Sequence, residues 1–227
     1  MRSAVLLSWA AASAWANAAW SGVTVTGGGW AFGVGEIDKA MAIVNDQGDA
    51  GVNYFVHATS AISYSTFTQS VNTTLAWGTA PGVLRVEGDL SSAGTILFEI
   101  VGKSNSGAVG GGTVEFDTTL VMGNIDLRAN AALRFVVASG VTFERGDTFT
   151  LMATADGKTI VADLEQLRAR LDGLPSLPDG LDWELRISQG SFEGYGGDSL
   201  VLMAVPMPGP AALFALAAVT GARRRRR

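Results

Sequence analysis

Short apolar runs with an alternating pattern, separated by glycines, constrain the fold of this chain more than any other feature. Leu133, Phe135 and Val137 occupy every second position of one run, and Phe149 and Leu151 do so in another. Alternation of this kind places apolar side chains on one face of a β-strand. Glycines separate the runs as turn or bulge positions, at Gly88, Gly94, Gly102, Gly123, Gly140 and Gly146. The short, fairly regular spacing predicts an all-β body.

Two all-β architectures fit this pattern. The segment 123–137 predicts two strands with the small residues Ala129, Ala131 and Ala132 at the bend between them. Parallel β-helices stack such units over a continuous aliphatic core. A β-sandwich with jelly-roll connections buries alternating aliphatic residues in much the same way. The sequence therefore predicts a Gly-rich β-helix-like or β-sandwich body, with the β-helix-like form slightly preferred.

One segment has helical periodicity. Ile160, Leu164, Leu167 and Leu171 recur at three- and four-residue spacing, and a glycine and a proline follow as stop signals. This spacing predicts one short amphipathic helix over about 159–171. We expect it to cover the open end of the β-body, and a partner-binding helix is the alternative.

The N-terminal segment has the pattern of a secretory signal peptide. Arg2 precedes an apolar stretch, and Ala16-Asn17-Ala18 fits the small-x-small cleavage pattern. We therefore expect residues 1–18 to be removed after about Ala18, which makes residues 19–204 an exported β-rich domain. A buried N-terminal helix is the alternative.

The C-terminal segment, residues 205–227, has three parts in a fixed order. A proline-rich break is followed by the apolar residues 210–222 and then by a basic cluster. Its candidate sorting residues are Val205, Pro206, Pro208, Gly209, Arg223, Arg224, Arg225, Arg226 and Arg227. The apolar part predicts a hydrophobic helix that begins near Pro210, because prolines interrupt any longer one. It is short for a stable transmembrane helix, and the positive-inside bias keeps the arginines cytoplasmic.

This tail resembles the PEP-CTERM sorting signal of Gram-negative bacteria, with Met207 where the name-giving motif has glutamate. The resemblance implies an exosortase-type processing enzyme as partner, a transient stay in the inner membrane, and release to the cell surface or medium. It also implies a link with exopolysaccharide and biofilm production. A simple membrane anchor and a nucleic-acid-binding arginine tail are the alternatives.

The body itself resembles autotransporter-like passenger regions and the bodies of many surface proteins with such tails. The resemblance rests on the run Gly-Asp-Thr-Phe-Thr-Leu-Met at 146–152 and on the later Leu-x-Trp strand at 181–183. It is diffuse and has no fixed repeat length. It implies a strand-rich passenger rather than a particular activity.

Charge and cysteine content exclude several classes of function. Without the two terminal segments the body keeps 10 basic and 21 acidic residues, a formal charge of −11. An acidic body argues against nucleic acid or anionic lipid as a partner. The chain has no cysteine, which excludes disulfides and metal sites built on thiolates.

The sequence offers no convincing catalytic constellation. His57 is the sole histidine, and no Gly-x-Ser-x-Gly nucleophile motif accompanies it. Neighbouring acids that could act on glycans are the pairs Glu87 with Asp89, Glu115 with Asp117, and Asp179 with Asp182. Acids at turns of an acidic exported protein are usually solvated, so we expect no enzyme activity and no catalytic residues. A glycan-acting enzyme on the same scaffold is the less favoured alternative.

Two binding hypotheses stay open. Asp46, Asp49 and Asn53 in a polar turn, and a glycine-rich turn at 194–200, have the oxygen ligands that calcium prefers. A set of aromatic residues could stack on sugars, namely Trp30, Trp77, Trp183 and Tyr195. We therefore expect no cofactor, with calcium as an alternative, and a non-enzymatic matrix or surface protein, with a glycan- or calcium-binding adhesin as the second hypothesis.

Overall fold

The computed structural model describes residues 66–71, 73–76, 81–105 and 113–207, and the backbone of four further short strands nearer the N-terminus. The predicted signal peptide with Ala16 and Ala18 lies outside the described residues. So does the tail from residue 208 onward, which holds Pro208, Gly209, the predicted hydrophobic helix and Arg223 to Arg227. The described part is built of strands in three sheets, which confirms the all-β prediction.

Sheet A has the spatial order β15-β12-β9-β6-β3-β1-β2. Its strands are β1 (Val23–Thr26), β2 (Trp30–Phe32), β3 (Tyr54–Ala58), β6 (Thr73–Ala76), β9 (Thr95–Ile100), β12 (Ala132–Val137) and β15 (Leu171–Asp172). Sheet B has the order β16-β17-β13-β10-β7-β4. Its strands are β4 (Ile62–Ser63), β7 (Val83–Val86), β10 (Thr118–Val121), β13 (Thr148–Thr154), β16 (Leu181–Gln189) and β17 (Asp198–Pro206).

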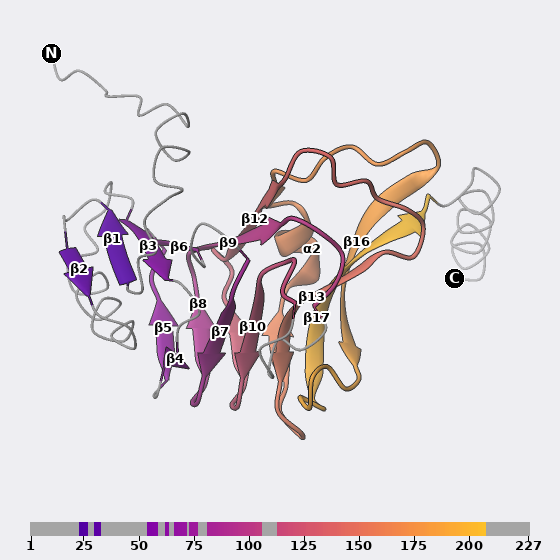
Figure 1. Ribbon diagram of the computed structural model, residues 1–227. Coiled ribbons are helices and arrows are strands. Elements are labelled where there is room, and N and C mark those ends of the chain that lie inside the picture. The colour runs from indigo at the N-terminus through magenta and orange to yellow at the C-terminus, as the bar shows by residue number, and fades with distance from the viewer. Residues whose placement is uncertain are drawn as a thin grey trace, which may run out of the picture.

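Sheet C has the order β14-β11-β8-β5, with β5 (Phe67–Gln69), β8 (Leu90–Ser92), β11 (Ile125–Leu127) and β14 (Ile160–Ala162). From β4 to β15 the chain visits sheets B, C and A in strict rotation. We call each set of three strands a circuit: β4-β5-β6, β7-β8-β9, β10-β11-β12 and β13-β14-β15. Strands of successive circuits pair in parallel, and Figure 1 shows those of sheet B side by side.

The core lies between the three sheets. Residues at equivalent positions of successive circuits lie side by side on paired strands. In sheet C the aligned residues are Phe67, Leu90, Ile125 and Ile160. In sheet A, Phe98 and Phe135 are aligned and stack with their ring centroids 5.8 Å apart. The alternation predicted at Leu133 and Phe135 is confirmed, because both side chains are buried. Each circuit therefore directs its inward residues into a core that is continuous with that of the next circuit.

The C-terminal end departs from the parallel pattern. β17 pairs antiparallel with β13 and also with β16, so sheet B continues for two strands beyond the last circuit. Figure 1 shows this orange-to-yellow hairpin at one end of the molecule and β1 and β2 at the other. At that N-terminal end, β1 pairs antiparallel with β2 and with β3.

The prediction of a helix over about 159–171 is wrong in its extent. The helix α2 spans only Leu164–Arg168 and is capped at its N-terminus by Asp163, whose side chain accepts a hydrogen bond from the Gln166 N–H. Ile160 belongs to β14 and Leu171 to β15, each paired in parallel with a strand of the preceding circuit. The apolar spacing therefore comes from two strands and one helical turn that all direct apolar residues into the core.

The described part of the chain has no helix that is both long enough and apolar enough to span a membrane. α2 is too short by a wide margin, since a span needs about 20 residues. Leu167 of α2 is buried, and Leu164 and Leu171 pack against the core from the same region. α2 therefore packs against the core through Leu164 and Leu167.

Candidate functional site

The first acidic pair belongs to the turn between sheets B and C. The Asp89 Oδ1 accepts a hydrogen bond of 2.7 Å from the backbone N–H of Asn124, which occupies the equivalent turn of the next circuit. Asn124 Oδ1 in turn accepts one of 3.1 Å from the backbone N–H of Thr159. Glu87 is exposed and no contact brings it to Asp89. Asp89 thus joins neighbouring circuits and does not face Glu87 as a catalytic partner.

The second acidic pair lies between sheets A and B, and its two carboxylates have separate structural partners. Glu115 Oε2 accepts hydrogen bonds from the backbone N–H groups of Lys103 and Ser104, at 2.9 and 2.8 Å. Asp117 is almost fully buried and accepts two short hydrogen bonds, one on each oxygen. The donors are the N–H groups of Gly82 and Glu99, both at 2.7 Å.

Asp117 has the most perturbed carboxyl group of the described residues. Burial raises the pKa of Asp117 well above its ordinary value, although the hydrogen bonds from Glu99 and Gly82 act in the opposite direction. The negative charge of Glu99 raises it further, and burial also raises the pKa of Glu99 itself. Perturbed carboxyl groups can mark active sites. Here both oxygens of Asp117 are used within the fold, which makes the group a brace between β7 and β9.

The remaining catalytic candidates are also dispersed. Asp179 is exposed in the loop before β16, and Asp182 Oδ1 accepts a hydrogen bond from the N–H of its neighbour Trp183. His57 lies on β3, where its backbone aligns with Thr24 of β1. Among the described residues, none of the three predicted acid pairs has its two carboxylates facing each other across a cleft.

Trp183, a candidate for sugar stacking, is part of an aromatic cluster instead. Its ring contacts Phe143 edge-on with centroids 5.0 Å apart, and Phe149 lies at 6.3 Å. The indole N–H donates to the Pro175 carbonyl oxygen at 3.0 Å. Because both its face and its polar atom are used within the protein, Trp183 holds the 173–180 loop against the core. Trp30 lies on β2, and Trp77 lies outside the described residues.

Tyr195 lies on the outer face of sheet B. A tight turn between β16 and β17 pairs Phe192 with Tyr195, and the two residues between them, Glu193 and Gly194, both have positive φ, as a type I′ hairpin turn requires. Phe192 and Tyr195 pack over buried residues on the outward side of sheet B, namely Val83, Leu120 and Ala153. We call this region the outer patch of sheet B.

The outer patch of sheet B also carries charge. Burial raises the pKa of Tyr195, the positive charge of Arg85 acts to lower it, and the negative charge of Glu87 acts to raise it. The phenol hydroxyl therefore lies within electrostatic reach of both an arginine and a carboxylate. A half-buried aromatic ring beside charged hydrogen-bonding groups is the chemistry with which proteins hold polar ligands that have an apolar face.

The calcium hypotheses receive no support from the described part of the chain. Asp198, in the glycine-rich turn, uses its Oδ2 to accept a hydrogen bond of 3.0 Å from the Ile160 N–H. Among the described residues no group of three or more His, Cys, Asp or Glu side chains could hold a metal ion. Asp46, Asp49 and Asn53 lie outside the described residues.

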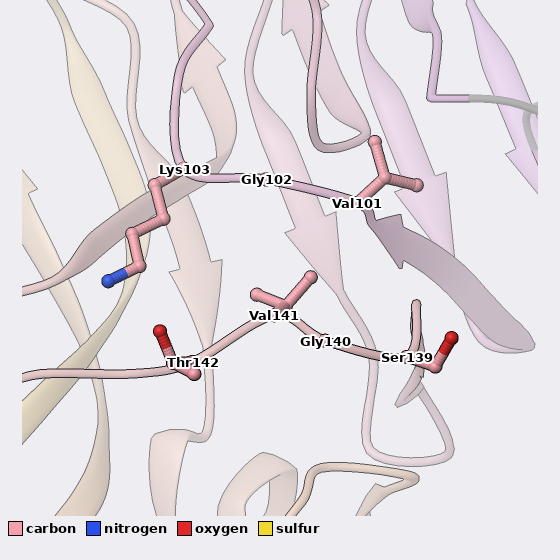
Figure 2. Close-up of a pocket in the computed structure, with 7 residues that line it drawn as sticks. All are labelled: Val101, Gly102, Lys103, Ser139, Gly140, Val141 and Thr142. Carbon is pink, nitrogen blue, oxygen red and sulfur yellow. The ribbon is translucent and has the colours of Figure 1, made fainter.

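A shallow depression lies between the loops that leave β9 and β12. Its volume is about 390 Å³, and it is lined by Val101, Gly102, Lys103, Ser139, Gly140, Val141 and Thr142. Figure 2 shows the Val141 side chain directed toward the 101–103 segment, whereas the Val101 side chain points away from the 139–142 segment. The charged group, Lys103 Nζ, is bound to Asp147 at 2.7 Å. Lys103 is therefore occupied, and the other polar side chains at the depression are the hydroxyls of Ser139 and Thr142.

Val205 and Pro206, the first two candidate sorting residues, are part of the folded body. They end β17, where they pair with Asp182 and Leu181 of β16. The backbone N–H of Met207 donates to the Gly180 carbonyl oxygen at 2.8 Å. The strand therefore continues two residues past the boundary at residue 204 expected from the sequence.

Comparison with known proteins adds no family to this picture. No protein-family model matches the chain, and no curated protein matches it significantly. Sequence reasoning overlooked the roles of Asp117, Asn124 and Arg85. A signal for one of them was present, since Gly88-Asp89-Leu90 recurs as Gly123-Asn124-Ile125.

Proposed function

We propose that this chain is an exported, non-enzymatic surface or matrix protein that is sorted through its C-terminal segment and works together with exopolysaccharide. The observation that carries the proposal is the direct junction between body and tail. β17 ends at Pro206 and the Met207 N–H is bound to the body, so the Val-Pro-Met-Pro-Gly segment begins within the last strand. A folded passenger joined directly to a short address segment suits transient retention at a membrane followed by release.

We further propose that the body is a parallel β-helix rather than a sandwich. Support comes from the strict rotation of strands among three sheets and from the in-register parallel pairing of successive circuits. A sandwich has two packed antiparallel sheets. A stack of circuits gives a stiff body with repetitive side-chain rows, which suits a structural or display role.

The non-enzymatic part of the proposal is supported by what the acids do. Asp89, Glu115, Asp117 and Asp198 each accept hydrogen bonds from backbone N–H groups of other segments. Carboxylates that act on glycosidic bonds instead face each other across a substrate cleft, about 5 to 9.5 Å apart. Release of reducing sugars from the host's own polysaccharide by the purified protein would contradict this part.

The decisive experiment is to determine both termini of the protein recovered from its native host, by intact mass and terminal peptides. We expect a chain that starts near Ala19 and lacks Arg223 to Arg227. A chain that keeps the arginines overturns release and leaves a membrane-anchored periplasmic protein. A chain that keeps residues 1–18 overturns export through a cleaved signal peptide.

A glycan-binding adhesin is the second candidate, and the outer patch of sheet B favours it. Tyr195 there combines a half-buried ring with the nearby charges of Arg85 and Glu87. Sedimentation of the protein with host exopolysaccharide tests this candidate. Tyr195→Ala is expected to reduce binding and Tyr195→Phe, which keeps the ring, to preserve most of it. Equal binding by Tyr195→Ala and the wild type removes the patch from consideration.

A further inference from the structure

Sheet B ends in a strand that has a partner on one side only. β16 pairs antiparallel with β17 along its whole length, and among the described residues no strand lies beyond it. Figure 1 shows the hairpin of these two strands at one end of the molecule. β16 has nine residues, whereas proteins often keep edge strands short because a long open edge pairs with other chains.

The backbone groups that face this open edge follow from the hydrogen bonds around it. In an antiparallel pair, every second residue directs both its N–H and its C=O to the partner strand. The Met207 N–H donates to the Gly180 carbonyl oxygen, which continues the register of β16 with β17 and places the even-numbered residues of β16 in the hydrogen-bonded positions. Trp183, Leu185 and Ile187 therefore direct their backbone groups to the open edge.

Two side chains cover part of this edge in the single chain. The Arg168 Nη2 donates to the Leu185 carbonyl oxygen at 2.8 Å, and the Trp183 N–H donates to Asp182 Oδ1 at 2.8 Å. Both contacts agree with the assignment of Trp183 and Leu185 to the open edge. Because side chains make them, a second strand can replace them without disturbing the pairing of β16 with β17. They make association at this edge weak and reversible.

The side chains of β16 are complementary to themselves about Leu185. Leu185 is buried and Trp183 and Ile187 pack against the core, so Glu184 and Arg186 lie on the outward face of the sheet. In an antiparallel pair of two β16 strands with Leu185 opposite Leu185, each Glu184 lies opposite the Arg186 of the other copy. Trp183 then lies opposite Ile187 on the inward face. Cross-strand pairs of both kinds are stabilising, and two-fold symmetry forms each of them twice.

We propose that two copies of this chain associate through β16, antiparallel and centred on Leu185, so that their B sheets form one continuous sheet. The charges specify this register. A centre one residue earlier places Glu184 opposite Glu184, and a centre one residue later places Arg186 opposite Arg186, both of which are unfavourable. The proposal goes beyond the proposed function, because it does not depend on how the chain is exported or sorted.

Sedimentation velocity of the full-length protein over a concentration series tests the association. We expect a dimer whose fraction rises with concentration, and a larger fraction for Arg168→Ala, which uncovers the Leu185 carbonyl oxygen. Glu184→Arg and Arg186→Glu each create two like-charge pairs and should raise the dimer dissociation constant by about tenfold or more. Arg145→Glu is the matched control, since it reverses an exposed charge elsewhere, and it should have no effect.

A mixture of the two charge-reversed variants makes the test specific. The Glu184→Arg chain carries two positive charges at this edge and the Arg186→Glu chain carries two negative ones. The mixture should therefore form a heterodimer at least as well as the wild type forms its dimer, which also shows that both variants are folded. Equal association by the wild type, each variant and the mixture places the contact on another surface and overturns the proposal. A wild type and an Arg168→Ala variant that both stay monomeric overturn it as well.

Introduced thiols then report the register, because the chain has no cysteine of its own. Opposing residues that are not hydrogen-bonded to each other have their Cα atoms about 4.5 Å apart, which a disulfide can bridge. We expect Glu184→Cys and Arg186→Cys chains, mixed in the presence of oxidised glutathione, to form chiefly the disulfide between positions 184 and 186, identified by intact mass. A preference for disulfides between identical chains contradicts the register centred on Leu185.

Discussion

Asp89 and Asn124 occupy the same turn position in successive circuits, 35 residues apart, and the Asp89 carboxylate binds the Asn124 backbone N–H. Asn124 repeats this contact with Thr159 after another 35 residues. Backbone bonds run alongside, from Leu90 N–H to the Asn124 carbonyl oxygen and from Ile125 N–H to that of Thr159. The turn row therefore satisfies polar groups that would otherwise lie unpaired where the chain passes from one sheet to the next.

Gly123, beside this row, should not tolerate a side chain. A Cβ there would lie 2.2 Å from Asp89 Oδ1 and 2.6 Å from the Gly88 carbonyl oxygen. We expect Gly123→Ala to lower the free energy of unfolding by about 1–3 kcal/mol, measured by urea denaturation. Removing the Asp89 side chain as well should not restore stability, since the Gly88 contact is with backbone. An unaltered midpoint for Gly123→Ala would mean that the two turns are not packed this closely.

The paired rings of Phe98 and Phe135 should be a main source of stability. Phe98 is fully buried, and its ring packs against Phe135 in the next circuit. Phe98→Ala is expected to cost about 3–5 kcal/mol because it leaves a cavity as well as removing apolar burial. Val161→Ala is the comparison, since Val161 is 62 % exposed, and it should change stability by less than about 0.5 kcal/mol. Thermal and urea unfolding of both variants check the difference.

Stability should fall as the pH rises through the titration of Asp117. Because burial raises the pKa of the Asp117 carboxyl in the folded protein, the folded state binds more protons than the unfolded state above the ordinary pKa of about 3.9. The extra stability is complete below that value and is lost as the pH passes the raised pKa. The raised pKa of Glu99 contributes with the same sign.

Asp117→Asn isolates the contribution of Asp117 to this pH dependence. The amide should lose one of the two backbone hydrogen bonds, at a cost of about 1–3 kcal/mol at low pH, and the decline with pH should become shallower. Urea unfolding across the acidic to neutral range measures both effects. Asp179→Asn, which changes an exposed carboxylate, should reproduce the wild-type slope. If Asp117→Asn keeps the wild-type dependence of stability on pH, Asp117 is not the group responsible for that dependence.

Arg168 should protect the edge of sheet B. It extends from α2 to donate to the Leu185 carbonyl oxygen of β16 at 2.8 Å, and it also pairs with Glu165. β16 is the terminal strand of its sheet, and open strand edges promote association between chains. Arg168→Ala is expected to lower stability by about 1 kcal/mol and to raise self-association, read by light scattering over a concentration series. Arg145→Ala, which removes an exposed loop arginine, should do neither.

The alternating runs predicted the inward faces well, because strand periodicity is a local property. Phe149 and Leu151 were expected on one face and both are buried. The helix over 159–171 failed because Ile160 is fixed by Ile125, a partner 35 residues away that no local pattern contains. The brace at Asp117 was missed for the same reason, since its donors Gly82 and Glu99 come from other segments.

The repeat was hard to see in the sequence because the strands of successive circuits do not recur at one constant spacing. Leu90, Ile125 and Ile160 are evenly spaced, whereas the connections from sheet A to sheet B vary in length. The predictions for the two ends of the chain depend on composition rather than packing. Of the residues in these two terminal segments, the structure describes only Val205, Pro206 and Met207. Val205 and Pro206 end β17, and Met207 follows it.

The antiparallel pairing of β13 with β17 ends the stack of circuits on its C-terminal side. A parallel edge on β13 would accept one more circuit, whereas β17 occupies that edge with reversed polarity. Lengthening of such a protein over evolution therefore does not occur by adding a circuit after β15, whereas a whole circuit can be inserted between two that already match. The hairpin of β16 and β17 acts as a fixed terminator, and the number of circuits before it can change without altering how the chain ends.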